Sequence, residues 1–257
     1  MAILGIDVGG SGIKGALVEN GQVITERLRI PTPQPSTPEA IAVTLNEIMK
    51  AFNYKGAIGC GFPALILDGV IKTAANIHKS WIDVPAEKLF TKTTGQPVFL
   101  INDADAAGLA EINYGAGKDK MGTIFVITIG TGLGSAIFIN GQLVPNTELG
   151  HLKMYGKSAE KYCSDAVRTK KNLSWKQWAM RFNEYLAYIE FLFSPQLIIL
   201  GGGASKKFDQ FAPYLKSRTE IVPAELKNHA GIIGAAVWAH SKSQSQTISL
   251  IHQDNLL

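Results

Sequence analysis

The apolar residues of this chain fall into two patterns, short continuous runs and longer stripes at helical spacing. The short runs predict buried strands at 3–6, 57–61, 98–101, 124–129 and 197–200. The stripes predict helices at 38–52, 85–93, 158–169, 174–193 and 231–240. Strands and helices alternate along most of the chain, and this pattern predicts an α/β fold.

Local residues sharpen several of these elements. Ser36 or Thr37 is expected to cap the helix from Pro38, and Ser174 the helix 174–193. That last helix carries a core stripe of large side chains, namely Trp178, Phe182, Tyr185, Leu186, Ile189, Leu192 and Phe193. The helix 231–240 is rich in small residues that permit tight packing, and a polar, mobile tail is expected from Ser241.

Two stretches, 3–30 and 123–145, are predicted to be three-stranded meanders. Each contains an Asn-Gly pair, Asn20-Gly21 and Asn140-Gly141, which is a strong hairpin-turn signal. Shifting the sequence by 120 residues gives six identities across the thirteen positions that begin at Gly10 and Gly130. The repeat predicts a chain of two halves, each starting with a β-hairpin.

The first hairpin has a glycine-rich tip, Asp7–Gly15, which follows a buried strand. Glycine lets backbone N–H groups approach an anion, and Lys14 adds a point charge, so the tip is expected to bind phosphate. The tip matches G-x-G-x-x-G, but Asn20-Gly21 follows where a dinucleotide-binding fold needs a helix, so that reading is rejected. The P-loop pattern is absent.

The second tip, Gly130–Gly134, repeats this chemistry. Two such tips facing each other across a cleft could hold the two ends of a phosphoryl group. A duplicated structural hairpin without a ligand is the alternative. A third glycine run, Gly201–Gly203, follows a buried strand and lets a helix or a ligand come close to the sheet.

Acidic residues lie where a strand is expected to end and a helix to begin, in Asn102–Gly108. In open α/β sheets this is the usual place for ligand chemistry. One of Asp103 and Asp105 is expected to cap the helix, which leaves the other for acid–base work. Past the second meander, Glu148 and His151 are hydrogen-bonding groups for a polar ligand, or else ordinary surface residues.

The chain has 257 residues, of which 46% are hydrophobic and 18% charged, and this suits two globular domains. We predict domains at 1–114 and 115–257, with Gly115–Lys118 as the hinge and a helix near 230–240 completing the first domain. No apolar run of 18 residues and no signal peptide are evident, and two cysteines, Cys60 and Cys163, fit a reducing cytoplasm.

The net charge of +4 is concentrated in one segment. Residues 151–181 hold eight basic side chains against two acids, and the basic ones are Lys153, Lys157, Lys161, Arg168, Lys170, Lys171, Lys176 and Arg181. A solvated helical face is one explanation. The other is a track for an extended polyanion.

Together these motifs resemble the ROK family of sugar kinases and repressors. The resemblance covers about residues 3–240 and rests on five motifs: Asp7-x-Gly9-Gly10-x-Gly12-x-Lys14, Asn102-Asp103-Ala104, Gly130-Thr131-Gly132-x-Gly134, Glu148-x-Gly150-His151 and Gly201-Gly202-Gly203. It implies a duplicated ribonuclease H-like fold of the actin-like ATPase and hexokinase type, with two domains around a cleft.

The resemblance also implies roles for these residues. Asp103 is the expected catalytic base, which takes the proton from a sugar 6-hydroxyl as that oxygen attacks the terminal phosphoryl group. The sugar is held by Asn76, Asn102, Asp103, Glu148, His151 and Glu160. The phosphoryl donor is held by Asp7, Gly9, Gly10, Ser11, Gly12, Lys14, Gly130, Thr131, Gly132, Gly134, Gly201, Gly202 and Gly203. Mg²⁺ accompanies the donor, with Asp7 as its contact through water.

Within the family, four runs look like the polyphosphate glucokinase branch: 75–82, 102–108, 173–178 and 193–199. Glucose and polyphosphate, with ATP as a second donor, are the substrates that this branch implies, and a cytoplasmic homodimer without nucleic-acid or membrane partners is expected. Only Cys163 stands where most members carry a cysteine-rich zinc motif, so no zinc is predicted. Ala64 replaces a glycine common after Phe-Pro in the family's kinases.

Three rival functions remain. One is an ATP-dependent hexose kinase of the same family. Another is a sugar-sensing repressor, which needs a DNA-binding helix-turn-helix for which the sequence leaves no room before the strand at Ile3. The third is an actin-like filament protein, against which the sugar-binding motifs stand.

Overall fold

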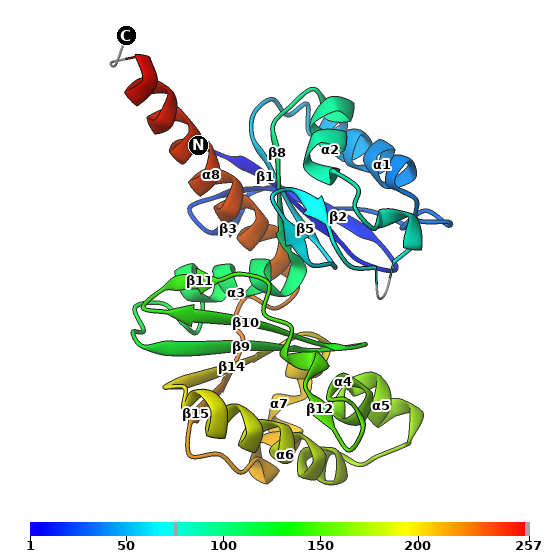
Figure 1. Ribbon diagram of the computed structural model, residues 1–257, viewed down its shortest axis with the longest axis vertical. Coiled ribbons are helices and arrows are strands. Elements are labelled where there is room, and N and C mark those ends of the chain that lie inside the picture. Colours follow the sequence, from blue (N-terminus) through cyan, green and yellow to red (C-terminus); the bar gives the residue numbers. More distant parts are fainter. Residues whose placement is uncertain (75–76, 255–257) are drawn as a thin grey trace. The chain divides into compact units, whose positions relative to one another are not determined.

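The computed structural model describes residues 1–74 and 77–254. These residues form two compact units (Figure 1). Unit 1 consists of Met1–Ala110 and His229–Leu257, and unit 2 of Glu111–Asn228. The division at 1–114 and 115–257 and the hinge at Gly115–Lys118 stay predictions.

Unit 1 is built on a sheet with strand order β3-β2-β1-β5-β8, in which β4 also pairs with β2. Its strands are β1 Ile3–Val8, β2 Ile13–Glu19, β3 Gln22–Val23, β4 Leu28–Ile30, β5 Ile58–Phe62 and β8 Val98–Asn102. β1 is antiparallel to β2 and parallel to β5, which is parallel to β8. The predicted three-stranded meander therefore has a fourth strand, because the chain returns after β3 to pair with β2 again.

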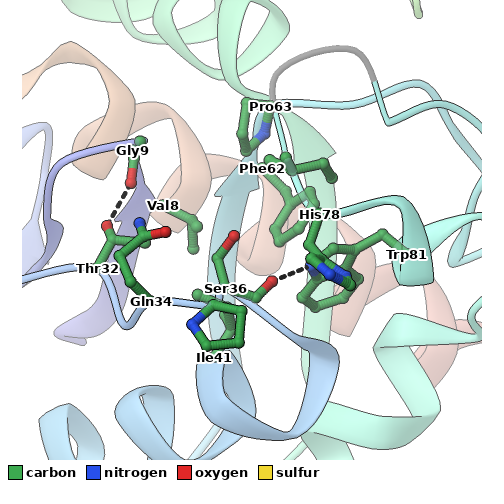
Figure 2. A pocket seen from close by; sticks show the side chains of 13 residues that line it. Val8, Gly9, Thr32, Gln34, Ser36, Ile41, Phe62, Pro63, His78 and Trp81 are labelled. Carbon is green, nitrogen blue, oxygen red and sulfur yellow. Dashed lines mark hydrogen bonds between the residues drawn. The ribbon is translucent and has the colours of Figure 1, made fainter.

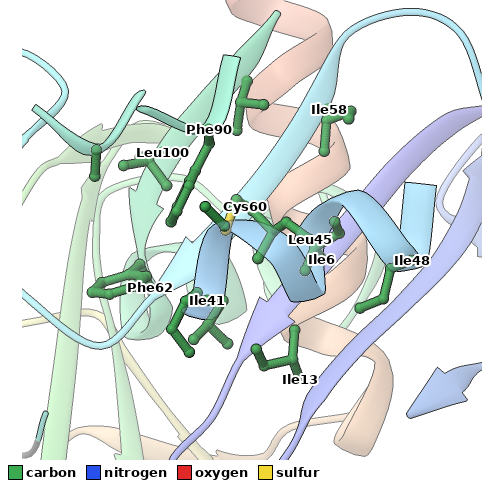
Figure 3. Packing of buried hydrophobic residues seen from close by; sticks show 14 of the residues in the cluster. Ile6, Ile13, Ile41, Leu45, Ile48, Ile58, Cys60, Phe62, Phe90 and Leu100 are labelled. Atoms are coloured by element: carbon green, nitrogen blue, oxygen red, sulfur yellow. The ribbon is translucent and has the colours of Figure 1, made fainter. Parts of the chain in front are cut away.

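Helices α1 (Pro38–Ala51), α2 (Ala86–Thr94), α3 (Asp103–Tyr114, which crosses into unit 2) and α8 (Ala230–Asp254) belong to this part of the chain. The Thr37 hydroxyl accepts a hydrogen bond from the Ala40 N–H, which confirms one of the two predicted caps of α1. Apolar side chains of α1 and α2 pack on those of the sheet around Cys60 (Figure 3). This core fixes the strand ends from which the site residues project.

Two small elements complete unit 1. Strands β6 (Ile66–Leu67) and β7 (Val70–Ile71) form a hairpin, with positive φ at Asp68 and Gly69 in its turn. The other is a 3₁₀ turn, η1 (Lys79–Trp81). It brings the Trp81 ring to 4.6 Å from the Phe62 ring, and both side chains are buried.

Helix α8 packs very closely on the sheet of unit 1. A Cβ atom at Gly5 would overlap the backbone of Ile232, and one at Gly59 the backbone of Ala235. The prediction of a small-residue helix suited to tight packing is therefore confirmed. Its predicted end near residue 240 is wrong, since the helix continues to Asp254 through a largely polar sequence that contains no glycine or proline to break it.

Unit 2 contains a second sheet, with strand order β11-β10-β9-β14-β15. Its strands are β9 Thr123–Ile129, β10 Leu133–Ile139, β11 Gln142–Val144, β14 Leu197–Gly201 and β15 Glu220–Pro223. The first three repeat β1, β2 and β3 of unit 1. Both connecting turns have positive φ at the Asn and the Gly, 50° and 75° in Asn20-Gly21 and 50° and 80° in Asn140-Gly141, so the repeat seen in the sequence is a repeat of structure.

An insertion follows the second hairpin and contains η2 (Leu149–His151), β12 (Lys153–Met154), β13 (Lys157–Ser158), α4 (Glu160–Cys163) and α5 (Asp165–Lys170). The predicted single helix 158–169 is wrong, because the helix is interrupted at Ser164. The Ser164 hydroxyl accepts from the Val167 N–H and so starts α5 as a separate helix.

Helix α6 (Trp175–Phe193) begins with the predicted Ser174 cap, which forms a complete capping box with Gln177. The core stripe from Trp178 to Ile189 is buried as predicted. Leu192 and Phe193 are 54% and 41% exposed, because the last turn of α6 runs beyond the core. The short elements η3 (Gly203–Lys207), α7 (Phe208–Phe211), η4 (Ala212–Tyr214) and η5 (Lys227–His229) complete unit 2.

Candidate active site

The first hairpin tip joins β1 to β2. Its turn is closed by a hydrogen bond of 3.2 Å from the Gly9 N–H to the Gly12 carbonyl. Space is open on the side-chain side of Gly10, where nothing lies within 4 Å of a Cβ position. Lys14 Nζ lies 3.3 Å from Asp7 Oδ2, so the lysine predicted to meet phosphate is already paired with a carboxylate.

A second cation reaches this tip. Arg29 Nη2 donates to the Ser11 carbonyl at 2.8 Å, and the guanidinium lies against Gly12, where Nε, Cζ and Nη2 would come within 2.6–2.7 Å of a Cβ. Thr32 Oγ1 donates to the Gly9 carbonyl at 2.5 Å. Neither Arg29 nor Thr32 was predicted. The signal available in the sequence is that both follow the Asn-Gly turn, Arg29 within the returning strand β4 and Thr32 two residues after that strand ends.

A pocket of about 240 Å³ opens beside Gly9 and Gly10 (Figure 2). Its apolar lining includes Phe62 and Trp81, while Gln34, Ser36 and His78 are among the polar residues that line it. The Trp81 indole donates to the Ser36 carbonyl at 2.8 Å and fixes the wall. An occupant of this pocket would touch the tip backbone. The sequence did not predict the pocket, since its walls come from 32–36, 62–63 and 77–81.

Asn102 and Asp103 lie where β8 ends and α3 begins, as predicted. The residue that caps the helix, however, is Asn102: its Oδ1 accepts from the N–H groups of Ala104 and Asp105 at 2.9 and 3.1 Å, and Asp103 Oδ1 shares the Ala104 N–H at 2.9 Å. Asn102 Nδ2 donates to the Ala64 carbonyl at 3.2 Å, so the buried amide ties two strand ends together. Asp105 is buried, whereas Asp103 is exposed at the start of the helix.

The second hairpin tip, between β9 and β10, is also closed by a hydrogen bond between two glycines, across a shorter turn. The Gly130 N–H donates to the Gly132 carbonyl at 3.0 Å, and nothing lies within 4 Å of a Cβ position at Gly130. Thr131 is exposed beside it, and Gly134 pairs with Thr128 in the sheet. The side chain that lies against Gly132 is acidic: Glu160 Oε2 is 2.7 Å from a Cβ position there.

The same glutamate belongs to a small acidic group with a histidine. His151 Nδ1 lies 4.0 Å from Glu160 Oε1, and His151 Nε2 lies 3.8 Å from Glu148 Oε2. Burial raises the pKa of Glu148, His151 opposes this shift and Glu160 reinforces it. The structure thus brings together three of the predicted sugar-binding residues, as neighbouring acceptors and a donor within unit 2.

Contacts within unit 2 fix the backbone around Glu148 and His151. The Ser135 hydroxyl donates to the Thr147 carbonyl at 2.6 Å and accepts from the Leu149 N–H at 2.9 Å. A Cβ at Gly150 would overlap the Leu133 carbonyl, so only glycine lets η2 lie this close to β10. These contacts fix Glu148 and His151 on either side of Gly150.

The third glycine run follows β14. Gly202 has φ of 78°, and a Cβ there would lie 2.5–2.6 Å from backbone atoms of Ile129, so its glycine serves close packing of the chain on β9. Gly203 has nothing within 4 Å of its Cβ position and is open to a ligand. Gly201 is the buried last residue of β14.

The basic segment divides into two kinds of side chain. Both arginines are partly buried and stack on aromatic rings, with Arg168 4.1 Å from the Trp175 ring and Arg181 5.2 Å from the Tyr162 ring. The six lysines are exposed, and none forms an ion pair within the part of the chain that the structure describes: Lys153, Lys157, Lys161, Lys170, Lys171 and Lys176. Their charge is available to a polyanion.

Asn76, the remaining predicted sugar-binding residue, lies outside the described residues. Within residues 1–74 and 77–254, no three His, Cys, Asp or Glu side chains gather as a metal-binding group. No described helix has the length and apolarity needed to cross a membrane. Both cysteines, Cys60 and Cys163, are buried and unbridged.

Residues 3–166, more than half of the chain, match the ROK family, and the chain belongs to that family. It is 48% identical over 236 residues to a polyphosphate glucokinase of Mycobacterium tuberculosis (strain CDC 1551 / Oshkosh), covering 91% of this chain and 89% of that protein. It is 46% identical over the same length to a polyphosphate glucokinase of Mycobacterium leprae (strain TN), covering 73% of it.

Among solved structures, the inorganic polyphosphate/ATP-glucomannokinase from Arthrobacter sp. strain KM superposes with a TM-score of 0.90 and 46% identity. That match covers 94% of this chain and 99% of the other. The resemblance to the ROK family and its polyphosphate glucokinase branch is therefore confirmed. So is the duplicated fold of the actin-like ATPase and hexokinase type.

Proposed function

We propose that this protein is a polyphosphate-dependent glucokinase, which transfers the terminal phosphoryl group of polyphosphate to the 6-hydroxyl of glucose. The observation that carries the proposal is the similarity over nine-tenths of the chain to polyphosphate glucokinases. Three local features support it: a glycine-rich tip with open backbone, an exposed carboxylate at a strand end, and a group of two carboxylates and a histidine.

In this proposal unit 1 provides the catalytic base and the backbone that binds the phosphoryl donor. Asp103 accepts the proton of the 6-hydroxyl as that oxygen forms a bond to phosphorus and the phosphoanhydride oxygen leaves. Asn102 positions it, because the Asn102 amide fixes the start of α3 against the loop at Ala64. The open backbone at Gly9 and Gly10 is the place for the phosphoryl group, and the adjoining pocket gives a ligand access to that backbone.

Unit 2 provides the sugar contacts. Glu148, His151 and Glu160 lie close enough to one another to share the hydroxyls of one hexose. A site that pairs each hydroxyl rejects analogues lacking one, because its polar groups would be left unpaired. The exposed lysines of 153–176 are proposed to attract the long anionic donor.

Magnesium is proposed to accompany the donor. Mg²⁺ in phosphoryl-transfer sites is commonly held by one or two carboxylates together with the substrate phosphates and waters. Asp7 fits that mode as a single carboxylate at the foot of the first tip, paired with Lys14. When bound, Mg²⁺ would neutralise charge on the transferring phosphoryl group.

ATP is proposed as a second donor, and the open face of Gly203 is available to it. We also propose a homodimer in the cytoplasm. Exposed apolar side chains on α6, with Phe191 84% and Met180 63% exposed, offer a surface for a second copy. The two unbridged cysteines suit a reducing compartment.

A donor-by-sugar activity matrix tests the proposal. Glucose 6-phosphate formation is measured with long-chain polyphosphate and with ATP, on glucose and other hexoses, at low and high salt. We expect the highest rate with polyphosphate and glucose, and a polyphosphate KM that rises with salt because exposed charges are screened. A preference for ATP without salt sensitivity would instead favour an ATP-dependent hexose kinase.

A further inference from the structure

The first hairpin tip carries two cations, and only one of them is neutralised. Lys14 Nζ is paired with Asp7 at 3.3 Å. Arg29 has no carboxylate within ion-pair distance among the residues that the structure describes. The free positive charge at this tip therefore belongs to Arg29, a residue in β4 that the ROK motifs do not include.

Three contacts fix the position of the guanidinium. Arg29 lies directly opposite Lys14 in the antiparallel pair of β4 and β2, so both side chains stand on the same face of the sheet. Its Nη2 donates to the Ser11 carbonyl at 2.8 Å. Its plane covers Gly12, where a Cβ atom would come within 2.6–2.7 Å of three guanidinium atoms.

This arrangement has a cost for folding. Like charges directly opposite each other on neighbouring strands are destabilising, and Lys14 and Arg29 form such a pair. Asp7, directly opposite Lys14 on β1, offsets the charge of Lys14 and leaves the charge of Arg29 for an anion. An anion at the open backbone of Gly10 would stand beside the guanidinium that covers Gly12.

We infer that Arg29 binds the phosphoryl donor, as the donor-binding cation of the first tip. The inference rests on the proposed function and deepens it. One of the five N–H groups of the guanidinium is used on Ser11, and the others remain for phosphate oxygens, which the planar fork matches in a bidentate manner. Lys14 then acts mainly through its pairing with Asp7.

The chemical class that this residue recognises is the terminal phosphoanhydride, which polyphosphate and ATP share. Arg29 contacts the donor end that reacts, so the loss of its charge weakens both donors. The exposed lysines of unit 2, by contrast, are expected to affect the long chain alone. Measuring both donors in one variant separates these two contributions.

The experiment compares Arg29→Gln and Arg29→Lys with wild type by steady-state kinetics, with polyphosphate and with ATP, at low and high salt. Arg27→Gln is the matched control, since Arg27 is exposed and lies two residues earlier. We expect Arg29→Gln to raise the KM of both donors about tenfold or more, as a charge-assisted hydrogen bond predicts. The glucose KM should stay within about twofold, and Arg29→Lys should recover part of the loss.

Direct binding provides the second readout. Titration calorimetry with inorganic tripolyphosphate measures affinity without turnover, on variants checked for folding by circular dichroism. Weaker tripolyphosphate binding by Arg29→Gln than by Arg27→Gln supports the inference. Equal donor KM and equal tripolyphosphate affinity in these two variants would overturn it. If the wild-type protein binds tripolyphosphate but transfers no phosphoryl group, the proposed function is wrong. The role of Arg29 in binding the donor is then decided by the difference in tripolyphosphate affinity between Arg29→Gln and Arg27→Gln.

Discussion

The two hairpin tips of this protein have similar backbones and differ in charge. Both follow a buried strand, and both leave one glycine, Gly10 or Gly130, open. Each is closed by a hydrogen bond between two glycines, which are three residues apart in the first tip and two residues apart in the second. The side chain that covers the next glycine is Arg29 in the first tip and Glu160 in the second. One duplicated scaffold therefore presents a cation at one tip and a carboxylate at the other.

The difference arises from the path of the chain after each hairpin. After β3 the chain returns as β4 along the same sheet, and this return carries Arg29 to the tip. After β11 it instead enters the insertion with β12, β13 and α4, which delivers Glu160 together with Glu148 and His151. From this difference we expect the first tip to suit a phosphoryl donor, and the second to serve the sugar as much as the phosphate.

The largest effect is expected from substitution of Asp103. This substitution tests whether the catalytic step can be lost while ligands still bind at the two tips. Asp103→Asn removes the base but keeps the size of the side chain at the start of α3. We expect kcat to fall by about 10²–10⁴-fold with glucose affinity retained. Single-turnover kinetics and a glucose-binding assay check this, and turnover near the wild-type rate would remove Asp103 from the role of base.

Alanine at the two covered glycines tests the comparison next. Gly12→Ala places a Cβ against the Arg29 guanidinium, and Gly132→Ala places one against the Glu160 carboxylate. Because both neighbours are ends of flexible side chains, each should move aside and leave the fold intact. We expect about a tenfold rise in donor KM for Gly12→Ala and in glucose KM for Gly132→Ala. The same KM rising in both variants would mean that the tips share one role.

The pH dependence of glucose binding tests the role of the acidic group beside the second tip. Burial raises the pKa of Glu148 above the ordinary value for a glutamate. As pH falls through that raised pKa, the carboxylate gains a proton and loses acceptor capacity, so the glucose KM should rise at a higher pH than for an unperturbed glutamate. Glu148→Gln should abolish this step in KM-against-pH profiles, and a step that survives the substitution belongs to another group.

The same shift has a consequence for stability. A glutamate whose pKa is raised in the folded state binds its proton more tightly there than in the unfolded chain. The free energy of unfolding should therefore decrease as pH rises from the ordinary glutamate pKa through the raised one. Denaturant titrations of wild type and Glu148→Gln across that window measure it, and the variant should lack the decrease.

The smallest effect is expected at the exposed lysines at the end of α5. Lys170→Gln with Lys171→Gln should raise the polyphosphate KM by a few-fold and leave the ATP KM unchanged, since a long chain samples more of the surface than ATP does. Lys50→Gln with Lys55→Gln, two exposed lysines of unit 1, is the matched control. An equal rise in the polyphosphate KM for the two double variants would show a general effect of net charge, without a specific role for Lys170 and Lys171.

Sequence alone predicted the features that neighbouring residues determine. The Asn20-Gly21 and Asn140-Gly141 turns have the positive φ values that this dipeptide favours, and the Thr37 and Ser174 caps bond within four residues. The stripe of α6 was predictable down to Ile189, because helical spacing alone places it in the core.

Features that depend on distant parts of the chain were not predictable. Arg29 is 18 residues from Ser11, and only the pairing of β4 with β2 brings them together. The sequence did not predict that Ser164 interrupts a helix or that Asn102 caps one. Neighbouring residues have similar capping ability, and tertiary contacts decide which of them becomes the cap. The ROK resemblance identified the acidic group of unit 2, but neither the pocket beside Gly9 nor the cation over Gly12.

The most direct test of the division between the tips is the pair Arg29→Gln and Glu160→Gln, each measured for both donor KM and glucose KM. The account predicts that Arg29→Gln raises donor KM about tenfold or more with little change for glucose, and that Glu160→Gln does the reverse. A donor KM that rises with Glu160→Gln and stays constant with Arg29→Gln would contradict it.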